Sequence, residues 1–309
     1  MAAYVFRRVL WTIPVLLAIA TITFGLMHLV PGGPWDRGGR PLPPRVEDRL
    51  DHEYGLDQPL WEQYAKYMIN LAHGDLGVSY RQNNRPVRDI LSDGIRISGT
   101  LGLLSLAVSL TAGVALGVAA ALRRNSAVDY AAMALTTAAA SVPSFVLGLL
   151  LLVVFTAHLQ WFPSGGWGTP KQAVMPVLAL SALPAAYIAR VTRASMLDVL
   201  TQDYARTARA KGLRERTVLL RHLLRNALIP ILTVAGPLAA ALVTGSFIIE
   251  QKFTIPGIGF AYVNAIIERD YGLIMGTTLF YATVVVVANL VVDLLYGVVD
   301  PRIRYGSHG

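Results

Sequence analysis

Long stretches without a charged side chain constrain this chain more than any other feature. Six such runs hold 18 residues or more. They are 9–35, 97–122, 130–170, 172–189, 226–249 and 271–292. A helix of about 20 residues, at about 1.5 Å per residue, crosses the roughly 30 Å apolar core of a bilayer. Because 54% of the 309 residues are hydrophobic and only 15% are charged, the sequence predicts an all-α integral membrane protein with six transmembrane helices.

The boundaries of these helices follow from the charges and turn formers between them. The third run is cut by Trp161–Gly168, which is rich in glycine and interfacial aromatic residues. The uncharged run 253–267 is shorter and starts near Pro256-Gly257, so we expect an interfacial or re-entrant loop there. The predicted order is a cytoplasmic N-terminus (1–8), helix 9–30, external loop 31–96, helix 97–122, cytoplasmic loop 123–129, helix 130–160, external loop 161–172, helix 173–189, cytoplasmic loop 190–226, helix 227–249, external loop 250–271, helix 272–298 and cytoplasmic tail 299–309.

The predicted orientation of the chain in the membrane rests on the number of lysine and arginine residues on each side. The side that holds the N-terminus, the 190–226 loop and the tail has 15 of them and a net charge of +10. The other side has 12, diluted by 13 acidic residues. The positive-inside rule therefore predicts that both termini are cytoplasmic. We expect the first run to be a retained helix rather than a signal peptide, because it is too long and no Ala-x-Ala site follows it.

The long loop 31–96 is expected to contain one amphipathic helix. Asp57 is positioned to cap it, Pro59 fits its first turn and Gly74 ends it. Apolar residues between Leu60 and Leu71 recur at helical spacing. We expect this face to pack on the outer ends of neighbouring spans, with contact to a partner protein as the alternative.

The loop 190–226 is the most basic part of the chain. A helix from about Ala194 to Lys211, a left-handed stop at Gly212 and a second helix leading to the fifth span are expected. Arg193 and the other arginines beside the membrane are interpreted as positive-inside anchors. The central turn lies too far from either span for that role, and a small-residue surface for another protein is expected from Ala205, Thr207, Ala208 and Ala210. The candidate docking residues are Tyr204, Ala205, Arg206, Thr207, Ala208, Arg209, Ala210, Lys211, Gly212 and Leu213.

At these residues the chain resembles the inner-membrane permease subunits of binding-protein-dependent ABC importers, in their dipeptide, oligopeptide and nickel group. The family signature is Glu-Ala-Ala, three residues and Gly, whereas this chain has Arg206-Thr207-Ala208, three residues and Gly212, without the glutamate. The segment 204–213 and the later Arg221-His222 look like the peptide group's own version. Further resemblances in order are Gly55–Leu60, Gly74–Gly77, Ser141–Phe145, Pro256–Gly259 and Asp300–Arg304.

The resemblance implies a dipeptide or oligopeptide pathway shared with a second, similar permease. It also implies two cytoplasmic ATPases that carry ATP and Mg, and an external substrate-binding protein. The residues agree that this chain is no ATPase, because a phosphate-binding loop needs Gly-Lys-Ser/Thr and none of its four lysines follows glycine. The chain has no cysteine, no local metal motif and no expected cofactor or catalytic residue.

Two features inside the predicted spans leave alternatives open. Ser141, Pro143 and Ser144 bring polarity and a break into the third span, which fits either kinked packing or a pathway for a polar solute. Asp293 is a carboxylate within the sixth span, and hydrogen bonding to a neighbouring helix is the simpler interpretation. A proton-coupled secondary transporter that uses Asp293 is the alternative function, and a membrane scaffold without transport is a third class.

Overall fold

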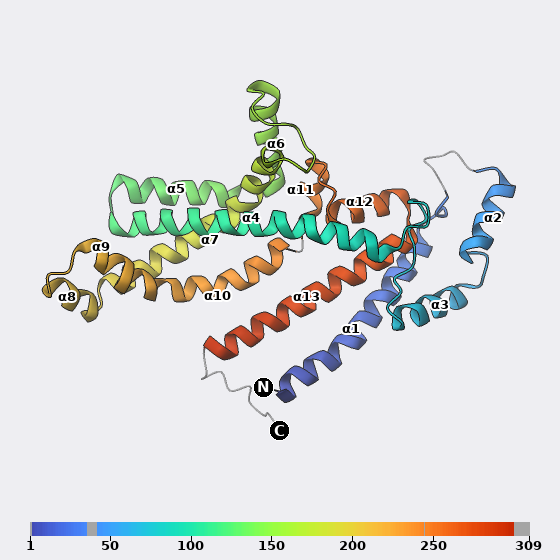
Figure 1. Cartoon of the computed structure of the whole chain (residues 1–309), viewed down its shortest axis with the longest axis horizontal. Coiled ribbons are helices and arrows are strands. Elements are labelled where there is room, and N and C mark those ends of the chain that lie inside the picture. The colour runs from blue at the N-terminus through green and yellow to red at the C-terminus, as the bar shows by residue number, and fades with distance from the viewer. Residues whose placement is uncertain (1, 36–41, 244, 300–309) are drawn as a thin grey trace. The chain divides into compact units, whose positions relative to one another are not determined.

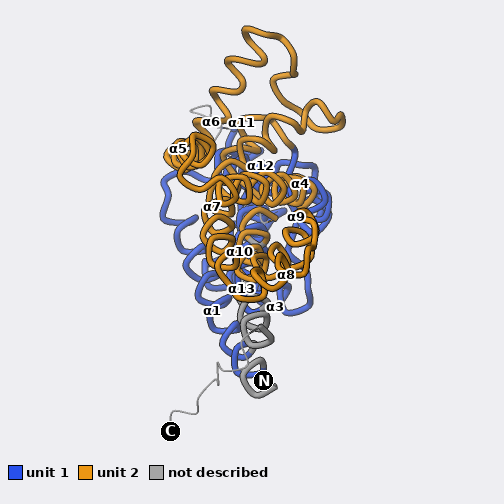
Figure 2. The backbone as a smooth tube through the Cα atoms, turned by 90° about the vertical axis from the view of Figure 1, so that its left-hand side faces the viewer, with its two compact units in different colours: residues 1–98, 256–290, 305–309 blue, residues 99–255, 291–304 orange. Residues whose placement is uncertain are grey.

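The computed structural model describes residues 2–35, 42–243 and 245–299. This part of the chain is mostly helical and contains no β-strand, only an isolated bridge between Val78 and Pro86. The described residues divide into two compact units, shown in blue and orange in Figure 2. Unit 1 includes residues 1–98 and 256–290, and unit 2 includes residues 99–255. The all-α class predicted from the charge-free runs is therefore confirmed.

Unit 1 is built from the segment 31–96, predicted to be an external loop, and from the helices at both ends of the chain (Figure 1). Its buried core includes Met27, Val87, Ile258 and Leu273. Its elements are α1 (Ala2–Leu29), α2 (Pro44–Tyr54), α3 (Leu60–Ala72), the start of α4 (Val87–Leu122), α12 (Ile258–Glu268) and most of α13 (Tyr271–Val299).

Asp270 joins the segments of unit 1. Its buried carboxylate accepts the backbone N–H of Tyr80 at 3.0 Å and of Leu273 at 3.2 Å, and the hydroxyl of Ser79 also donates to it. The carboxylate therefore caps the N-terminus of α13, where the helix dipole favours negative charge. Burial, with Asp270 nearby, raises the pKa of Tyr80 to about 12, so this phenol stays neutral at physiological pH.

The segment 31–96 and the later segment 253–267 differ in part from their predictions. The amphipathic helix is present as α3, and Tyr67, Met68 and Leu71 pack against the core of unit 1. Asp57 does not cap it, because Pro59 occupies that position and Asp57 instead pairs with His52. Helix α2 was not predicted, although its apolar residues Val46, Leu50 and Tyr54 recur at helical spacing; none of its residues is buried. The segment 253–267, expected to be a loop, contains the helix α12.

Unit 2 is a bundle in which α7 is the central helix. More than half of the most apolar stretch of α7 is buried, and it packs on α5, α6 and α10. Its elements are the rest of α4, α5 (Ala127–Ser141), α6 (Ser144–Leu151), the π-helical turn η1 (Leu152–His158), α7 (Pro170–Leu200), α8 (Asp203–Ala210), α9 (Glu215–Thr217), the π-helical turn η2 (Val218–Leu223), α10 (Leu224–Val243) and α11 (Phe247–Lys252).

Helices α4 and α7 approach each other through glycine. A Cβ atom at Gly113 would lie 2.8 Å from the carbonyl oxygen of Ala185, and one at Gly117 would lie 2.5 Å from Cβ of Thr192. Gly113 and Gly117 form a Gly-x-x-x-Gly pattern, which lets apolar helices pack closely in membranes. This pattern was visible in the sequence and was not used in the predictions above.

Among the residues that the structure describes, four helices are long and apolar enough to cross a membrane: 6–29, 87–122, 170–200 and 215–243. A fifth candidate is the pair α5 and α6, which bends by 101° at the break between them. The break expected at Ser141, Pro143 and Ser144 is therefore present. Helix α10 ends at Val243 instead of residue 249, followed by Gly245 at φ +86° and the separate helix α11. The sixth span remains a prediction, because the apolar part of α13 with described side chains, 271–287, is shorter.

Candidate functional site

The basic loop folds as a short helix between two longer ones, and we call residues 204–213 the coupling segment. The predicted helix from Ala194 to Lys211 is wrong in one respect, because it divides at Thr201 and Gln202. The Thr201 hydroxyl donates to the carbonyl of Asp198 at 2.8 Å, and such local side-chain bonds compete with helical ones. Gln202 is extended, and α8 starts anew at Asp203, whose charge suits a helix N-terminus.

Two of the three alanines of the coupling segment, Ala205 and Ala208, face inward, which corrects part of the expected small-residue docking surface. Ala205 has no exposed surface and Ala208 is 6% exposed. They lie three residues apart on one face of α8 and belong to a core with Met196, Val218 and Leu223. Small side chains at these positions let α8 lie close to α7 and to the returning turn η2. These two alanines therefore attach α8 to its own chain.

The outward face of the coupling segment is polar and cationic with two apolar side chains. Tyr204 and Leu213 are 38% and 40% exposed. Arg206 has a loose contact with Asp203 at 3.9 Å, with both side chains well exposed. Such a pair contributes little energy, so Arg206 is available to a partner. The exposed members of the predicted set are Tyr204, Arg206, Thr207, Arg209, Ala210, Lys211, Gly212 and Leu213.

The turn after α8 is held in one geometry. Gly212 has φ +71°, the left-handed conformation predicted for it. Across the turn, Nε and Nη2 of Arg209 donate to the two carboxylate oxygens of Glu215 at 3.2 and 2.9 Å. This hydrogen bonding raises the pKa of Arg209, which is already charged. Because the pair is exposed, it contributes more to the shape of the turn than to stability.

One charged pair was missed by the sequence prediction. Arg193, interpreted as an interfacial anchor, donates from Nε and Nη2 to the two carboxylate oxygens of Asp129 at 2.6 and 2.7 Å. The Asp129 side chain is only 3% exposed, and it also accepts the backbone N–H of Asn125. The pair ties the start of α5 to α7. A signal was available, since Asp129 is the one acidic residue between positions 97 and 197.

The other predicted site residues are distant in sequence from the coupling segment. Ser141 is exposed beside the α5–α6 break, and its hydroxyl donates to the carbonyl of Thr137 at 2.8 Å. A role for Ser141, Pro143 and Ser144 in a solute pathway remains a prediction. Asp293 lies on α13, but its side chain is outside the described residues. No cluster of His, Asp and Glu with the geometry of a metal site occurs among the residues searched, those that the structure describes.

Comparison with known sequences decides the family. Residues 113–305 match the family described as "Binding-protein-dependent transport system inner membrane component", and residues 1–98 match the N-terminal part of the membrane component of such systems. The chain belongs to this family. It is therefore a transport component rather than an ATPase, and a multi-pass protein of the bacterial inner membrane.

Two relatives of this permease align with it from end to end. The dipeptide transport system permease protein DppB of Bacillus subtilis (strain 168) is 43% identical over 309 residues, which is 100% of both chains. The oligopeptide transport system permease protein OppB of Escherichia coli (strain K12) is 41% identical over 99% of this chain and 100% of the relative. The resemblance to the peptide permease group stated from the sequence is confirmed.

Solved structures support the same fold. The inward-facing MetNI methionine ABC transporter matches with a TM-score of 0.55 at 20% identity, over 68% of this permease and 96% of that chain. An amino acid ABC transporter with histidines matches with a TM-score of 0.50 at 16% identity, over 70% of this permease and 95% of that chain. At these identities the likeness concerns the fold alone. None of these comparisons supports the proton-coupled alternative.

Proposed function

We propose that this permease is a subunit of an ATP-driven importer of dipeptides or short oligopeptides. Its end-to-end identity of 43% with a dipeptide permease is the observation that carries this proposal. It forms the membrane pathway together with a second, homologous permease. An external binding protein delivers the peptide, and two cytoplasmic ATPases bind ATP and Mg.

The membrane arrangement proposed for it has six spans, cytoplasmic termini and an external loop at 31–96. Four single helices and the bent α5–α6 pair support five of these spans by length and composition. The sixth rests on the charge-free run 271–292. The excess of lysine and arginine supports a cytoplasmic position for the coupling segment.

The proposed mechanism is alternating access driven through the coupling segment. ATP binding closes the ATPases, and their movement reaches the permease through the exposed face of α8, around Arg206 and Lys211. Ala205 and Ala208 pass the displacement to Met196 on α7 and Val218 on η2, because they are packed against these side chains. Reversing a population from 1:99 to 99:1 takes about 5.5 kcal/mol, so a broad helical contact suits this task better than one ion pair.

The direct test is peptide uptake by cells that express the complete importer. We expect radiolabelled dipeptide uptake to stop when ATP is depleted and to continue when the proton gradient is collapsed with ATP maintained. Uptake with the opposite dependence contradicts the proposal and favours a secondary transporter. A scaffold predicts no uptake under either condition and no ATPase that co-purifies in mild detergent.

A matched pair of charge reversals tests the coupling segment. Arg206→Glu is expected to reduce uptake at least tenfold while the permease still inserts. It places a negative charge where the proposed ATPase is expected to offer acidic groups to Arg206. Lys171→Glu reverses an exposed charge at the start of α7, on the opposite side of the proposed membrane, and should leave uptake near the unmodified level. Equal uptake by the two variants contradicts the docking role.

A further inference from the structure

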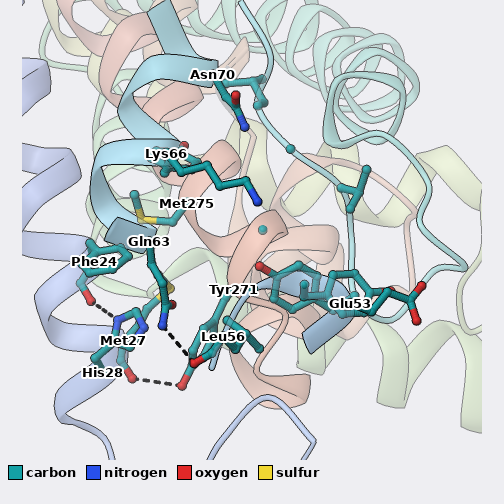
Figure 3. Close-up of a pocket in the computed structure, with 18 residues that line it drawn as sticks. Phe24, Met27, His28, Glu53, Leu56, Gln63, Lys66, Asn70, Tyr271 and Met275 are labelled. Atoms are coloured by element: carbon teal, nitrogen blue, oxygen red, sulfur yellow. Dashed lines mark hydrogen bonds between the residues drawn. The ribbon is translucent and has the colours of Figure 1, made fainter. Parts of the chain in front are cut away.

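Unit 1 contains a recess that no part of the proposed transport cycle uses. Its volume is about 260 Å³. It lies between the end of α1, the turn from α2 to α3, the segment 76–80 and the start of α13 (Figure 3). Pockets with an apolar floor and a few convergent polar groups are the usual form of small-molecule sites.

The floor of the recess is apolar and well fixed. Phe24, Met27 and Met275 line it together with the ring of Tyr271. The hydroxyl of Tyr271 donates to the backbone carbonyl of Met27 at 3.3 Å, shown as a dashed line in Figure 3. This hydroxyl is therefore engaged within the chain, and what Tyr271 offers to the recess is its ring.

One face of α3 supplies four of the polar residues that line the recess. Gln63, Lys66, Tyr67 and Asn70 all line the recess and follow the i, i+3, i+4, i+7 spacing of a helix face. The amide of Gln63 donates to the carbonyl oxygens of Leu56 and Gln58 at 3.0 and 2.8 Å. Its donors are therefore already used, and they brace the turn before α3.

The other three polar groups are unengaged in the described part of the chain. The Tyr67 hydroxyl is buried and has no hydrogen-bond partner there, although such a group normally finds one. Within the same residues Lys66 makes no ion pair and Asn70 no side-chain hydrogen bond. In Figure 3 the side chains of Lys66 and Asn70 project to the same side of α3, whereas the carboxylate of Glu53 points away.

The chemistry of these groups selects an anion. An ammonium has three donors, an amide nitrogen has two and a neutral phenol has one. Burial raises the pKa of Tyr67, so its phenol keeps its proton. Together these donors match a carboxylate, whose two oxygens accept several charge-assisted hydrogen bonds. The apolar floor beside them suits the side chain of a terminal residue.

We propose that this recess binds the free C-terminal carboxylate of a short peptide, with Lys66, Tyr67 and Asn70 as donors and the apolar floor under the last side chain. This inference rests on the proposed peptide transport. A lipid phosphate has similar charge, so the test below compares a peptide carboxylate with a glycerol phosphate directly.

The test uses the full-length permease in nanodiscs of zwitterionic phosphatidylcholine, without a binding protein. The probes are trialanine, its C-terminal amide and glycerol 3-phosphate, with affinity measured by equilibrium dialysis. We expect trialanine to bind at least tenfold more tightly than the other two. Lys66→Met and Tyr67→Phe should each weaken trialanine binding at least tenfold. Lys171→Met, the same change outside the recess, should have no effect.

Tyr67→Phe also separates binding from folding. It removes one oxygen atom that has no described partner, so the melting temperature without peptide should not fall. The increase in melting temperature that trialanine causes should be lost. Any one of four results would overturn the proposal. They are equal affinity for trialanine and its C-terminal amide, tighter binding of glycerol 3-phosphate than of trialanine, no trialanine binding at all, and unreduced trialanine binding by Lys66→Met. If the complete importer still takes up peptide in an ATP-dependent way, any of these results contradicts only the recess proposal and not the proposed function.

Discussion

Asp129 and Arg193 show what a single buried carboxylate does in a membrane protein. A charge is costly in an apolar environment unless it is paired and hydrogen-bonded. Asp129 has two hydrogen bonds from the Arg193 guanidinium and one from the Asn125 backbone. The pair therefore fixes how α5 meets α7, close in sequence to the coupling segment.

We expect Asp129→Ala to lower the melting temperature of the purified permease by several degrees, because Arg193 then keeps a half-buried charge without its partner. Asp93→Ala removes an exposed carboxylate that pairs with Arg85, and it should change the melting temperature little. Fluorimetric melting in detergent measures both variants. A melting temperature for Asp129→Ala that matches Asp93→Ala contradicts a stabilising role for the buried pair.

Gly212 provides a second prediction at the scale of one residue. No atom lies within 4 Å of a Cβ built there, so only its backbone conformation at φ +71° resists substitution. We expect Gly212→Asn to keep most uptake activity, Gly212→Ala to cost about 1 kcal/mol, and Gly212→Val to be worst. Uptake and melting temperature should follow that order. If uptake and melting temperature instead fall with side-chain size, so that Gly212→Asn is worse than Gly212→Ala, then crowding and not the backbone φ limits substitution at this position.

At the scale of elements, the contact of α4 with α7 depends on missing side chains. Gly117 lies against the carbonyl oxygen of Ala189 and Cβ of Thr192, which a Cβ atom would approach to 2.6 and 2.5 Å. Neither neighbour is the end of a flexible side chain. A larger residue at this position must therefore move one of the helices.

The prediction is that Gly117→Leu destabilises unit 2 by about 1–3 kcal/mol, as overpacking does in other cores. Gly99→Ala is the matched control, because Gly99 lies on the same helix with no atom within 4 Å of an added Cβ. Since alanine favours helices over glycine, Gly99→Ala should be neutral or slightly stabilising. Resistance to proteolysis in detergent distinguishes them, and similar resistance of both variants would contradict the close approach of α4 and α7.

The coupling segment shows the limits of prediction from sequence at this scale. Its basic charge, its helical character and the stop at Gly212 follow from residue types alone, and all three are present. The inward direction of Ala205 and Ala208 does not follow, because alanine fits both a surface and a core. Their burial depends on Met196 and Val218, which reach them only after the chain has folded back.

At the scale of the whole molecule, charge-free runs locate the long helices but not their ends. Helix α4 starts at Val87, ten residues before its predicted span, because polar residues continue a helix beyond an apolar run. The chain's two units also escape prediction, since unit 1 joins residues 1–98 to residues 256–290. Contacts such as Asp270 with Ser79 link positions too far apart for local patterns.

The absence of cysteine makes the proposed topology testable without a modified background. Ala72→Cys at the end of α3 and Ala210→Cys at the end of α8 place single thiols at exposed helical positions. We expect a membrane-impermeant maleimide to label Ala72→Cys in spheroplasts and Ala210→Cys only after the membrane is opened. The reverse labelling would invert the orientation derived from lysine and arginine.

The sharp bend between α5 and α6 has a consequence for backbone hydrogen bonding. Position 143 is proline, so the carbonyl oxygen of Ala139 has no amide proton four residues ahead of it. The hydrocarbon core of a bilayer offers no replacement donor, and a carbonyl oxygen without a hydrogen bond there costs several kcal/mol of free energy. Where such a bent pair crosses a bilayer, a neighbouring helix, a hydroxyl side chain or a water molecule is expected to supply the missing donor.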